Sequence, residues 1–489
     1  MLFNSHIFML LFLPLLLAGW YFLNWKKKFQ LAQGYLIGMS LWFYAYANLQ
    51  YLWLLLFSCL IGWLLSCLPE KIFSEKGKKV LTGVGCVFHL GLLGYFKYSN
   101  FFLENLNTVF HTDFPMLQIL LPVGISFYTF QQLAYLIDRC RGDAPRDSFF
   151  DYLTFMVYFP QLLQGPILLR SEFMGQLKEP ERRRFHAERF SEGIQFFVFG
   201  LAKKVLLADT LAKAVNYGYS NVSMLDSISA LLLAVGYLTE LYFDFSGYCD
   251  MAVGLGKMIG LEVAENFDAP FHSASVKEFW RRWHMTLGRF FTRYVYIPLG
   301  GNRRGKMRTL CNVMIVMLLS GLWHGAAWNF VLWGFLHGVG MIWDNLEHPH
   351  LPKKWMRQAA TFAYVCMTFV FFRAESIAQG IDVLKSIVSL KWNGFVFQMA
   401  SALDMTECYI ITKALSMKLP GLLSWFWLGI FVVLIAICFR VLSGEKVSGV
   451  VALQRQKGYG RLYPVLLAVL FTWSMISMTG VSEYLYFSF

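Results

Sequence analysis

The sequence has little charge: 15% of its 489 residues are Asp, Glu, Lys or Arg, and 57% are hydrophobic. Soluble domains contain about a quarter charged residues. This composition, with a mean hydropathy of +0.49, therefore excludes an ordinary soluble protein. Apolar runs of membrane-spanning length recur along the chain, whereas the short alternating segments of a membrane β-barrel do not. We predict an all-α polytopic membrane protein.

Several motifs of common enzyme and metal sites are also missing. The nine cysteines are scattered and never form C-x-x-C, so we predict neither a disulfide framework nor a structural metal site. No G-x-S-x-G, H-E-x-x-H or Walker motif occurs, which disfavours a hydrolase, a metalloprotease or an NTPase. The net charge of +13 indicates Lys and Arg in cytoplasmic loops, and we do not interpret it as nucleic-acid binding. No bound cofactor is predicted.

The apolar runs predict about 11 to 13 membrane-embedded elements in a single domain over 1–489, with a catalytic core at about 115–345. The Lys-rich loops after the first and third spans place the N-terminus outside the membrane. Segment 101–110 is interpreted as an interfacial piece, and 376–418 as interfacial or extramembrane. The other predicted elements, besides the central run, are 7–23, 31–47, 49–68, 80–96, a kinked helix at 120–131, a re-entrant or broken helix at 149–163, 193–207, 228–243, 251–261, 359–372, 425–440 and 463–478.

The apolar run 310–343 carries no charged residue. Its 34 residues would form one helix of about 51 Å, although a bilayer core needs only about 20 residues. We therefore expect a break, for which Gly321, Gly325 and Gly334 are candidates. His324 lies in the middle of the run, and an ionisable residue at membrane depth is by default a functional-site hypothesis.

A basic segment, 266–308, precedes this run. It has nine Lys or Arg and two acidic residues, and it carries a second histidine, His284. Between 276 and 294 the aromatic residues recur at helical spacing, which predicts an amphipathic helix at the cytoplasmic interface. One interpretation is membrane anchoring alone. The other is an anion site for a phosphate-bearing donor such as coenzyme A. The predicted donor-binding residues are Arg281, Arg282, Arg289, Arg303 and Arg304.

Each of the two histidines has a functional and a structural interpretation. A neutral imidazole at His324 can take a proton from an acceptor hydroxyl as it attacks a thioester. Alternatively, His324 is a packed side chain bonded to Ser320 one turn away. We predict that His284 orients the substrate or polarises the thioester carbonyl. His337 lies about 220° from His324 on a continuous helix, and we predict a structural role for it.

These residues resemble a known family. The runs FWRRWHMTLGRFFTRYVYIPLGGNRRG (279–305) and SGLWHGAAWNF (320–330) are similar to the membrane-bound O-acyltransferases, as are LPVGISFYTFQ (121–131) and FDFSGYCDMAVG (243–254). The resemblance is strongest to the bacterial branch that includes alginate, cellulose and peptidoglycan O-acetylation proteins and the teichoic-acid D-alanylation protein. It implies a ring of tilted helices around a central tunnel, with His324 as the essential histidine and His284 as the second polar position.

The resemblance also covers the two ends of the C-terminal region. Segment 369–384 is similar to the alginate-acetylation type. The chain ends in Tyr-Leu-Tyr-Phe-Ser-Phe, which resembles an aromatic motif whose tyrosine is proposed to carry the acyl group, so Tyr486 is a possible acyl relay. The alternative interpretation of this ending is an aromatic belt at the membrane interface.

The predicted function is therefore membrane O-acyl transfer. Acetyl would pass from a cytoplasmic thioester, with acetyl-CoA as the expected donor, across the bacterial inner membrane for O-acetylation of an extracytoplasmic polysaccharide. The expected partners are the donor or an acyl carrier, membrane lipid, the polysaccharide and an extracytoplasmic acetyltransferase. The alternatives are D-alanyl transfer from a carrier protein to teichoic acid, and a polysaccharide or lipid transporter without chemistry, to which the intramembrane Asp244 and Asp250 would be suited.

Overall fold

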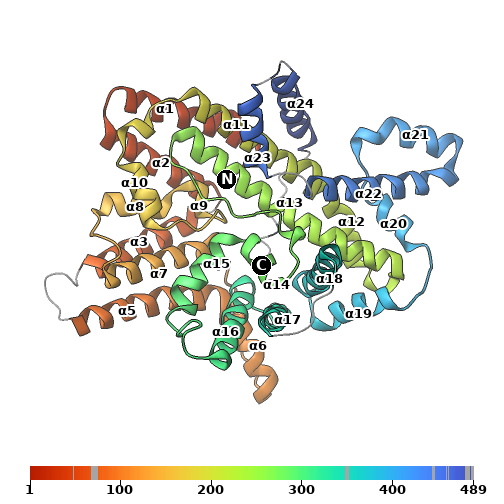
Figure 1. The fold of residues 1–489 in the computed structure, drawn as a ribbon, viewed down its shortest axis with the longest axis horizontal. Coiled ribbons are helices and arrows are strands. Elements are labelled where there is room, and N and C mark those ends of the chain that lie inside the picture. The colour runs from red at the N-terminus through yellow and green to blue at the C-terminus, as the bar shows by residue number, and fades with distance from the viewer. Residues whose placement is uncertain are drawn as a thin grey trace. The chain divides into compact units, whose positions relative to one another are not determined.

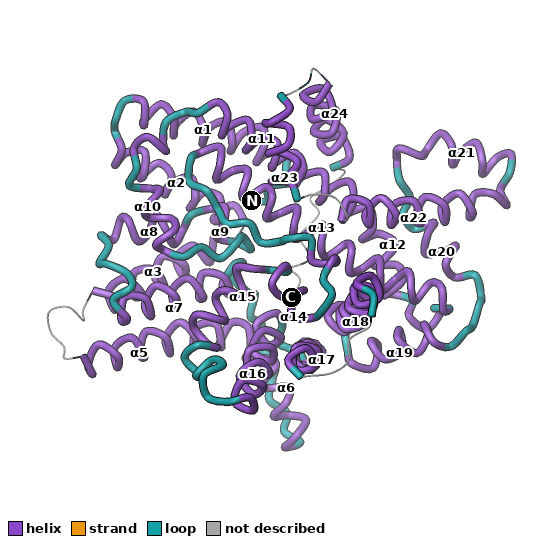
Figure 2. The backbone as a smooth tube through the Cα atoms, in the orientation of Figure 1, coloured by secondary structure: helices purple, strands orange, loops and turns teal. Residues whose placement is uncertain are grey.

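The computed structural model describes residues 1–47, 49–67, 75–346, 352–442, 446–458, 460, 462–478 and 485. All regular structure in these residues is helical (Figures 1 and 2). Within the described residues, six helices are long and apolar enough to cross a membrane, at 8–25, 49–67, 76–110, 227–259, 306–324 and 420–439. The prediction of an all-α polytopic membrane protein is confirmed, whereas the ring and its tunnel stay predictions.

The chain divides into two compact units, each drawn from separate stretches. Unit 1 contains 1–197, 248–266 and 286–298, and unit 2 contains 198–247, 267–285 and 299–489. Both histidines of the predicted site, 284 and 324, belong to unit 2. The predicted core at about 115–345 contains residues of both units. The assignment of 1–489 to a single domain stays a prediction.

Unit 1 holds the N-terminal helices. Helix α5 packs on α7, α3 on both, and α1 on α2. Its elements are η1 (Phe8–Phe12), α1 (Leu13–Trp25), α2 (Phe29–Ala47), η2 (Leu49–Tyr51), α3 (Leu52–Cys67), α5 (Glu75–Leu93), η3 (Gly94–Tyr98), α6 (Ser99–Phe110), α7 (Ile125–Arg141), α8 (Phe149–Val157), α9 (Phe159–Leu162), α10 (Arg170–Leu177), η4 (Pro180–Arg183), most of α11 (Ala187–Ala202), most of α15 (Met285–Phe291) and η8 (Thr292–Tyr296).

Two predictions for unit 1 have different outcomes. The broken helix at 149–163 is confirmed, because α8 and α9 are separated at Tyr158. Segment 101–110, predicted as an interfacial piece, lies in α6, which continues the helix of α5 and η3 without interruption; its position relative to the membrane stays a prediction. Two asparagines of α6 hold the extended segment that follows: Asn100 donates to the carbonyl of Leu117 (2.9 Å), and Asn107 donates to that of Phe114 (2.9 Å).

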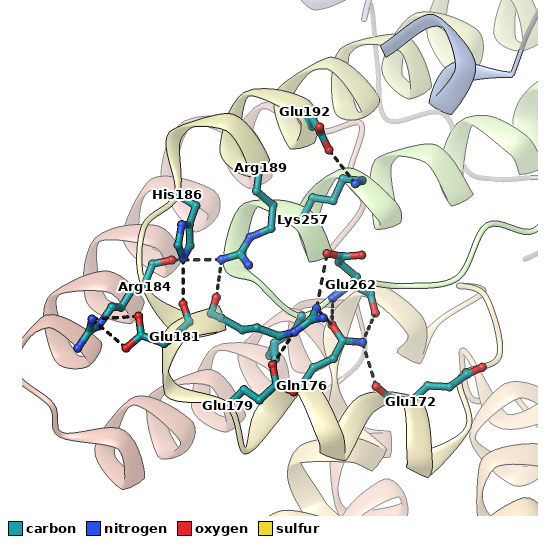
Figure 3. A network of polar contacts seen from close by, with 12 residues as sticks. Glu172, Gln176, Glu179, Glu181, Arg184, His186, Arg189, Glu192, Lys257 and Glu262 are labelled. Atoms are coloured by element: carbon teal, nitrogen blue, oxygen red, sulfur yellow. Dashed lines mark hydrogen bonds and ion pairs between the residues drawn. The ribbon is translucent and has the colours of Figure 1, made fainter. Parts of the chain in front are cut away.

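In the mixed-charge segment from Arg170 to Arg189, Arg182 forms an ion pair with Glu179 (2.9 Å), and Arg184 forms one with Glu181 (2.9 Å) (Figure 3). Lys257, near the end of α13, forms an ion pair with Glu192 (3.0 Å), and the backbone N–H of Glu262 donates to the Gln176 side chain (2.7 Å). The Lys257–Glu192 ion pair holds the end of α13 on α11, and the hydrogen bond to Gln176 holds the segment after α13 on α10.

Unit 2 holds the remaining helices. They are η5 (Lys203–Ala208), α12 (Asp209–Ser220), η6 (Val222–Met224), most of α13 (Ser227–Ile259), η7 (Pro270–His272), α14 (Val276–Arg282), α16 (Lys306–His324), α17 (Trp328–Asn345), α18 (Lys354–Arg373), α19 (Ile377–Val388), α20 (Phe395–Ser401), η9 (Thr406–Cys408), α21 (Tyr409–Lys418), α22 (Pro420–Leu442), α23 (Val447–Lys457) and α24 (Leu462–Ser477). Helix α17 packs on α14, α16 and α18.

Helix α13 corrects the prediction of two spans at 228–243 and 251–261. It is one helix, and the polar segment between the predicted spans does not interrupt it. Asp244 lies in that segment, is 2% exposed, and forms an ion pair with the equally buried Lys204 (2.6 Å). Lys204 also pairs with Asp209 (2.7 Å). The charge at this depth is therefore compensated inside the protein.

The central run forms two helices, as predicted, and the break is at Gly325. Helix α16 ends at His324, Gly325 is extended (φ −156°, ψ 148°), and α17 starts at Trp328. The two helices pack closely at Gly321 and Gly334, because a Cβ on Gly321 would lie 2.3 Å from the carbonyl oxygen of Phe330 and a Cβ on Gly334 would lie 2.4 Å from that of Met317. Small residues permit this approach of two backbones.

The predicted continuous helix over 276–294 is wrong. Helix α14 ends at Arg282, α15 begins at Met285, and His284 stands between them with φ +46°. A left-handed conformation is uncommon outside glycine and is enriched at functional sites when the surrounding structure enforces it. His284 is therefore presented from a turn rather than from a helical face.

Candidate active site

His324 lies at the end of α16, inside an aromatic enclosure formed by three helices of unit 2. Its side chain is 4% exposed. Its ring centroid lies 4.9 Å from Trp323, 5.2 Å from Trp333 of α17 and 5.1 Å from Phe372 of α18. The start of α17 is tied to the end of α18 by Asn329, whose amide donates to the carbonyl of Ala374 (2.7 Å). The surroundings of His324 are thus fixed from three sides.

The alternative interpretation of His324 as a partner of Ser320 is wrong. The Ser320 hydroxyl is buried and makes no hydrogen bond within the described part of the chain. The Ser320 hydroxyl is therefore not a hydrogen-bond partner of His324.

His284 faces the same aromatic group. It is fully buried, and its ring lies 4.8 Å from Phe245 of α13 and 6.2 Å from Trp323. Burial lowers the pKa of His284 to about 3, so its imidazole is neutral at neutral pH. Because Trp323 contacts both His284 and His324, one indole joins the two predicted site residues.

His337 is brought next to this site, although its helical spacing from His324 argued against a shared face. It is fully buried on α17, and its ring lies 4.8 Å from Trp333, which also contacts His324. The indole N–H of Trp280 donates to His337 Nδ1 (3.2 Å), and Thr368 Oγ1 lies 3.0 Å from Nε2. His337 thereby connects α14, which leads into His284, to α17 and α18.

The hydrogen bonds of His337 define its tautomer. An indole N–H can only donate, so Nδ1 is the acceptor and carries no proton. Nε2 then carries the proton and donates to Thr368, whose own hydroxyl donates to the carbonyl of Val365 (2.8 Å). The single lone pair of the imidazole is occupied, so His337 is not available as a base in this arrangement. The predicted structural role agrees with this geometry.

The five predicted donor-binding arginines are not equivalent. Arg282 pairs with Glu278 (2.9 Å), and Arg289 pairs with Glu172 in two contacts, one of 3.1 Å. Partial burial opposes ionisation of Glu278, but the N–H of Ala274 and the Arg282 guanidinium outweigh it and lower its pKa. The charges of these two arginines are therefore already neutralised by carboxylates.

The other three arginines are exposed. They are Arg281, Arg303 and Arg304. The last two lie in a glycine-rich turn in which Gly300, Gly301 and Gly305 have positive φ values of 107°, 55° and 89°. Asn312 of α16 donates to the carbonyl of Gly301 (2.9 Å) and so holds the turn on the helix that ends at His324.

Two further observations concern the predicted relay residue Tyr486 and groups that could hold a metal ion. Tyr486 lies outside the described residues. Its neighbour Leu485 is described, and the backbone N–H of Leu485 donates to the second carboxylate oxygen of Asp244 (3.1 Å). No group of three or more His, Cys, Asp or Glu in the described ranges lies close enough to hold a metal ion.

Residues 141–380, which include both site histidines, match the model of the membrane-bound O-acyltransferase family. The chain is 35% identical over 423 residues to a peptidoglycan O-acetyltransferase of Helicobacter pylori, covering 80% of each chain. It is 39% identical over 389 residues to a probable alginate O-acetylase of Azotobacter vinelandii, covering 77% of this chain and 76% of that one.

A more distant similarity is to a teichoic acid D-alanyltransferase of Bacillus subtilis, with 28% identity over 271 residues, 52% of this chain and 69% of that one. The helical, membrane-capable fold agrees with the family match. The chain therefore belongs to the membrane-bound O-acyltransferase family and is a multi-pass membrane enzyme, an O-acetyltransferase.

Proposed function

We propose that this enzyme takes an acetyl group from a thioester donor on the cytoplasmic side of the bacterial inner membrane and passes it outward for O-acetylation of an extracytoplasmic polysaccharide. The observation that carries the proposal is the pair of buried histidines, His284 and His324, which both contact the Trp323 indole. Relatives named for O-acetylation of peptidoglycan and alginate support the reaction and the acceptor class.

In the proposed reaction, His324 is the general base. It takes the proton of an acceptor hydroxyl while the hydroxyl oxygen attacks the thioester carbonyl carbon. The tetrahedral intermediate then collapses, the carbon–sulfur bond breaks, and the thiolate leaves with the proton that His324 held. His284, neutral and fixed by its turn, polarises the carbonyl or orients the substrate. No proton is gained or lost overall.

Acetyl-CoA is the proposed donor. Its phosphates suit the exposed guanidinium groups of Arg281, Arg303 and Arg304, because arginine binds phosphate oxygens bidentately. Arg282 and Arg289 were predicted to join them, but their ion pairs with Glu278 and Glu172 favour a role in holding the segment in place.

Tyr486 is proposed to accept the acetyl group transiently. Support comes from the residue before it: Leu485 is bonded to Asp244, and the next residue of α13, Phe245, contacts the ring of His284. Leu485 is therefore attached to the helix that borders the histidine site. A second, extracytoplasmic transferase is proposed to complete delivery to the polysaccharide.

The two alternative functions have less support. D-alanyl transfer rests on relatives of 28% identity that match about half of this chain. The transporter interpretation relied on Asp244 and Asp250 as lining groups for a pathway, but Asp244 is paired with Lys204 and Leu485 inside the protein. A carboxylate satisfied by the protein itself is not an argument for a permeation path.

The test uses purified protein in lipid nanodiscs with acetyl-CoA labelled in the acetyl group. The wild-type enzyme is expected to release CoA and to carry the label covalently, whereas Tyr486→Phe is expected to carry none. Tyr484→Phe is the matched control, because it removes a hydroxyl from the same segment and is expected to keep the label.

Each outcome has one meaning. CoA release without label on the wild-type protein would refute the relay and support direct transfer. A wild-type protein that neither binds nor cleaves acetyl-CoA would refute the donor, and the same assay with a D-alanyl carrier protein would then decide between acetyl and D-alanyl transfer.

A further inference from the structure

Two buried donors near His324 make no hydrogen bond in the described part of the chain, the Ser320 hydroxyl and the Trp333 indole N–H. Trp333 of α17 is 1% exposed, and its indole N–H makes no hydrogen bond with any residue that the structure describes. A buried polar group without a partner costs the folded state free energy, and native structures contain few of them. The position of this one, with its ring 5.2 Å from that of His324, is therefore a feature to be explained.

The neighbouring indole of Trp280, in contrast to that of Trp333, has a hydrogen-bond acceptor. Trp280 contacts Trp333 (5.7 Å between centroids) and lies in the same aromatic group, yet its N–H donates to His337. His337 cannot also accept from Trp333, because its one lone pair is occupied by Trp280 and its second nitrogen bears a proton. Of these two neighbouring indoles, Trp280 therefore has an acceptor for its N–H, and Trp333 has none among the described residues.

We propose that the Trp333 N–H donates to the carbonyl oxygen of the acetyl thioester as that oxygen becomes negatively charged, which makes Trp333 a further catalytic residue. This role rests on the proposed function, since it assigns a donor to the same reaction at the same site. When the acceptor oxygen attacks and His324 takes its proton, the carbonyl electron pair moves onto oxygen, and the N–H stabilises that charge. When the thiolate leaves, the electron pair on oxygen re-forms the carbonyl double bond. Trp333 only donates a hydrogen bond during these steps, so it neither gains nor loses a proton.

A donor that is unsatisfied in the resting enzyme suits this task. Catalysis is favoured by interactions that form with the transition state and are absent beforehand. The Trp333 indole is held among Phe369, Phe372, His324 and His337, so it needs no reorganisation when charge develops. The cost of burying the N–H is then offset by its use in the reaction.

The test is Trp333→Phe in the full-length enzyme, with thermal unfolding and acetyl-transfer kinetics measured on the same preparation. Because Phe removes an unsatisfied donor, the unfolding midpoint is expected to be at least as high as that of the wild type, after allowance for the lost ring volume. The kcat is expected to fall by about 10²–10³-fold, the range for loss of one donor to a developing oxyanion, while the KM for the donor changes little.

A second replacement keeps the ring volume. 3-Benzothienylalanine at position 333 has sulfur in place of the N–H and the same shape, so it separates loss of the donor from loss of packing. It is expected to reproduce the fall in kcat with no loss of stability. Trp280→Phe is the matched control: it removes a satisfied N–H, so stability is expected to fall by more than in either 333 variant and kcat by less.

The results that would overturn the proposal are distinct from those that would refute the function. A kcat within about twofold of wild type for the benzothienyl variant would overturn it, since an oxyanion donor is worth far more than that. So would a loss of stability in that variant, which would mean that the N–H has a structural partner. A wild-type enzyme that transfers no acetyl group would refute the proposed function itself, and the catalytic role with it.

Discussion

Replacing His324 with Ala is expected to lower the rate of acetyl transfer by about 10²–10⁴-fold, the usual contribution of a general base. His324 is buried at the end of α16, and the hydroxyl of Ser320, its closest polar neighbour along the helix, makes no bond in the described part of the chain. The reduction should appear in kcat, because the exposed arginines proposed to bind the donor are unchanged. Steady-state kinetics in nanodiscs, with acetyl-CoA binding measured separately, check this.

Two further variants make the His324 result specific. His324→Gln keeps a polar side chain in the enclosure but supplies no base, so it should be as slow as His324→Ala. His272→Ala changes a histidine of the same unit, at the end of η7, and should keep wild-type activity. If folded His324→Ala retained near-normal transfer, His324 would not be the base.

Replacing His337 with Phe is expected to destabilise the protein and to slow it moderately. The change leaves the Trp280 N–H buried without an acceptor, which costs about 1–3 kcal/mol in the free energy of unfolding. Trp280 lies on α14, four residues before His284, so its displacement should disturb the turn that presents His284. We expect kcat to fall by about tenfold in the protein that remains folded, as for a misplaced group rather than a missing one.

The double variant Trp280→Phe and His337→Phe tests whether the loss of stability comes from the Trp280 N–H that is left without an acceptor. It removes both halves of the hydrogen bond, so no donor is left unsatisfied and part of the lost stability should return. The pH dependence of kcat should be unaffected in His337→Phe and in the double variant, because the lone pair of His337 is already occupied. A His337→Phe protein with wild-type stability and no activity would instead identify His337 as a second base.

The membrane helices were largely predictable because apolar runs of this length have few other structures. The break of the central run was also foreseen, with Gly325 among three candidates, since 34 uncharged residues exceed what a bilayer needs. The unbroken α13 was not foreseen. Its polar segment is kept helical by Lys204, which lies 40 residues earlier in the chain, and no local pattern indicates such a partner.

The site itself was only partly predictable. The motifs pointed to His284 and His324, and the structure joins both through Trp323. The left-handed turn at His284 was missed, because the aromatic period continues across it. The proximity of His337 was missed because the angle argument assumed one continuous helix, whereas the break at Gly325 folds α17 back onto α16. Trp333 carries no sequence signal at all, since its donor stands out only once the partners of the other buried indoles are known.

The most direct test of the central claim is the sidedness of the transfer. The enzyme is reconstituted in sealed liposomes, the inward- and outward-facing molecules are distinguished by protease access, and labelled acetyl-CoA is supplied on one side only. We expect label to accumulate on an acceptor enclosed on the opposite side, with wild-type protein and not with His324→Ala. Label confined to the donor side, with active wild-type protein, would contradict transfer across the membrane.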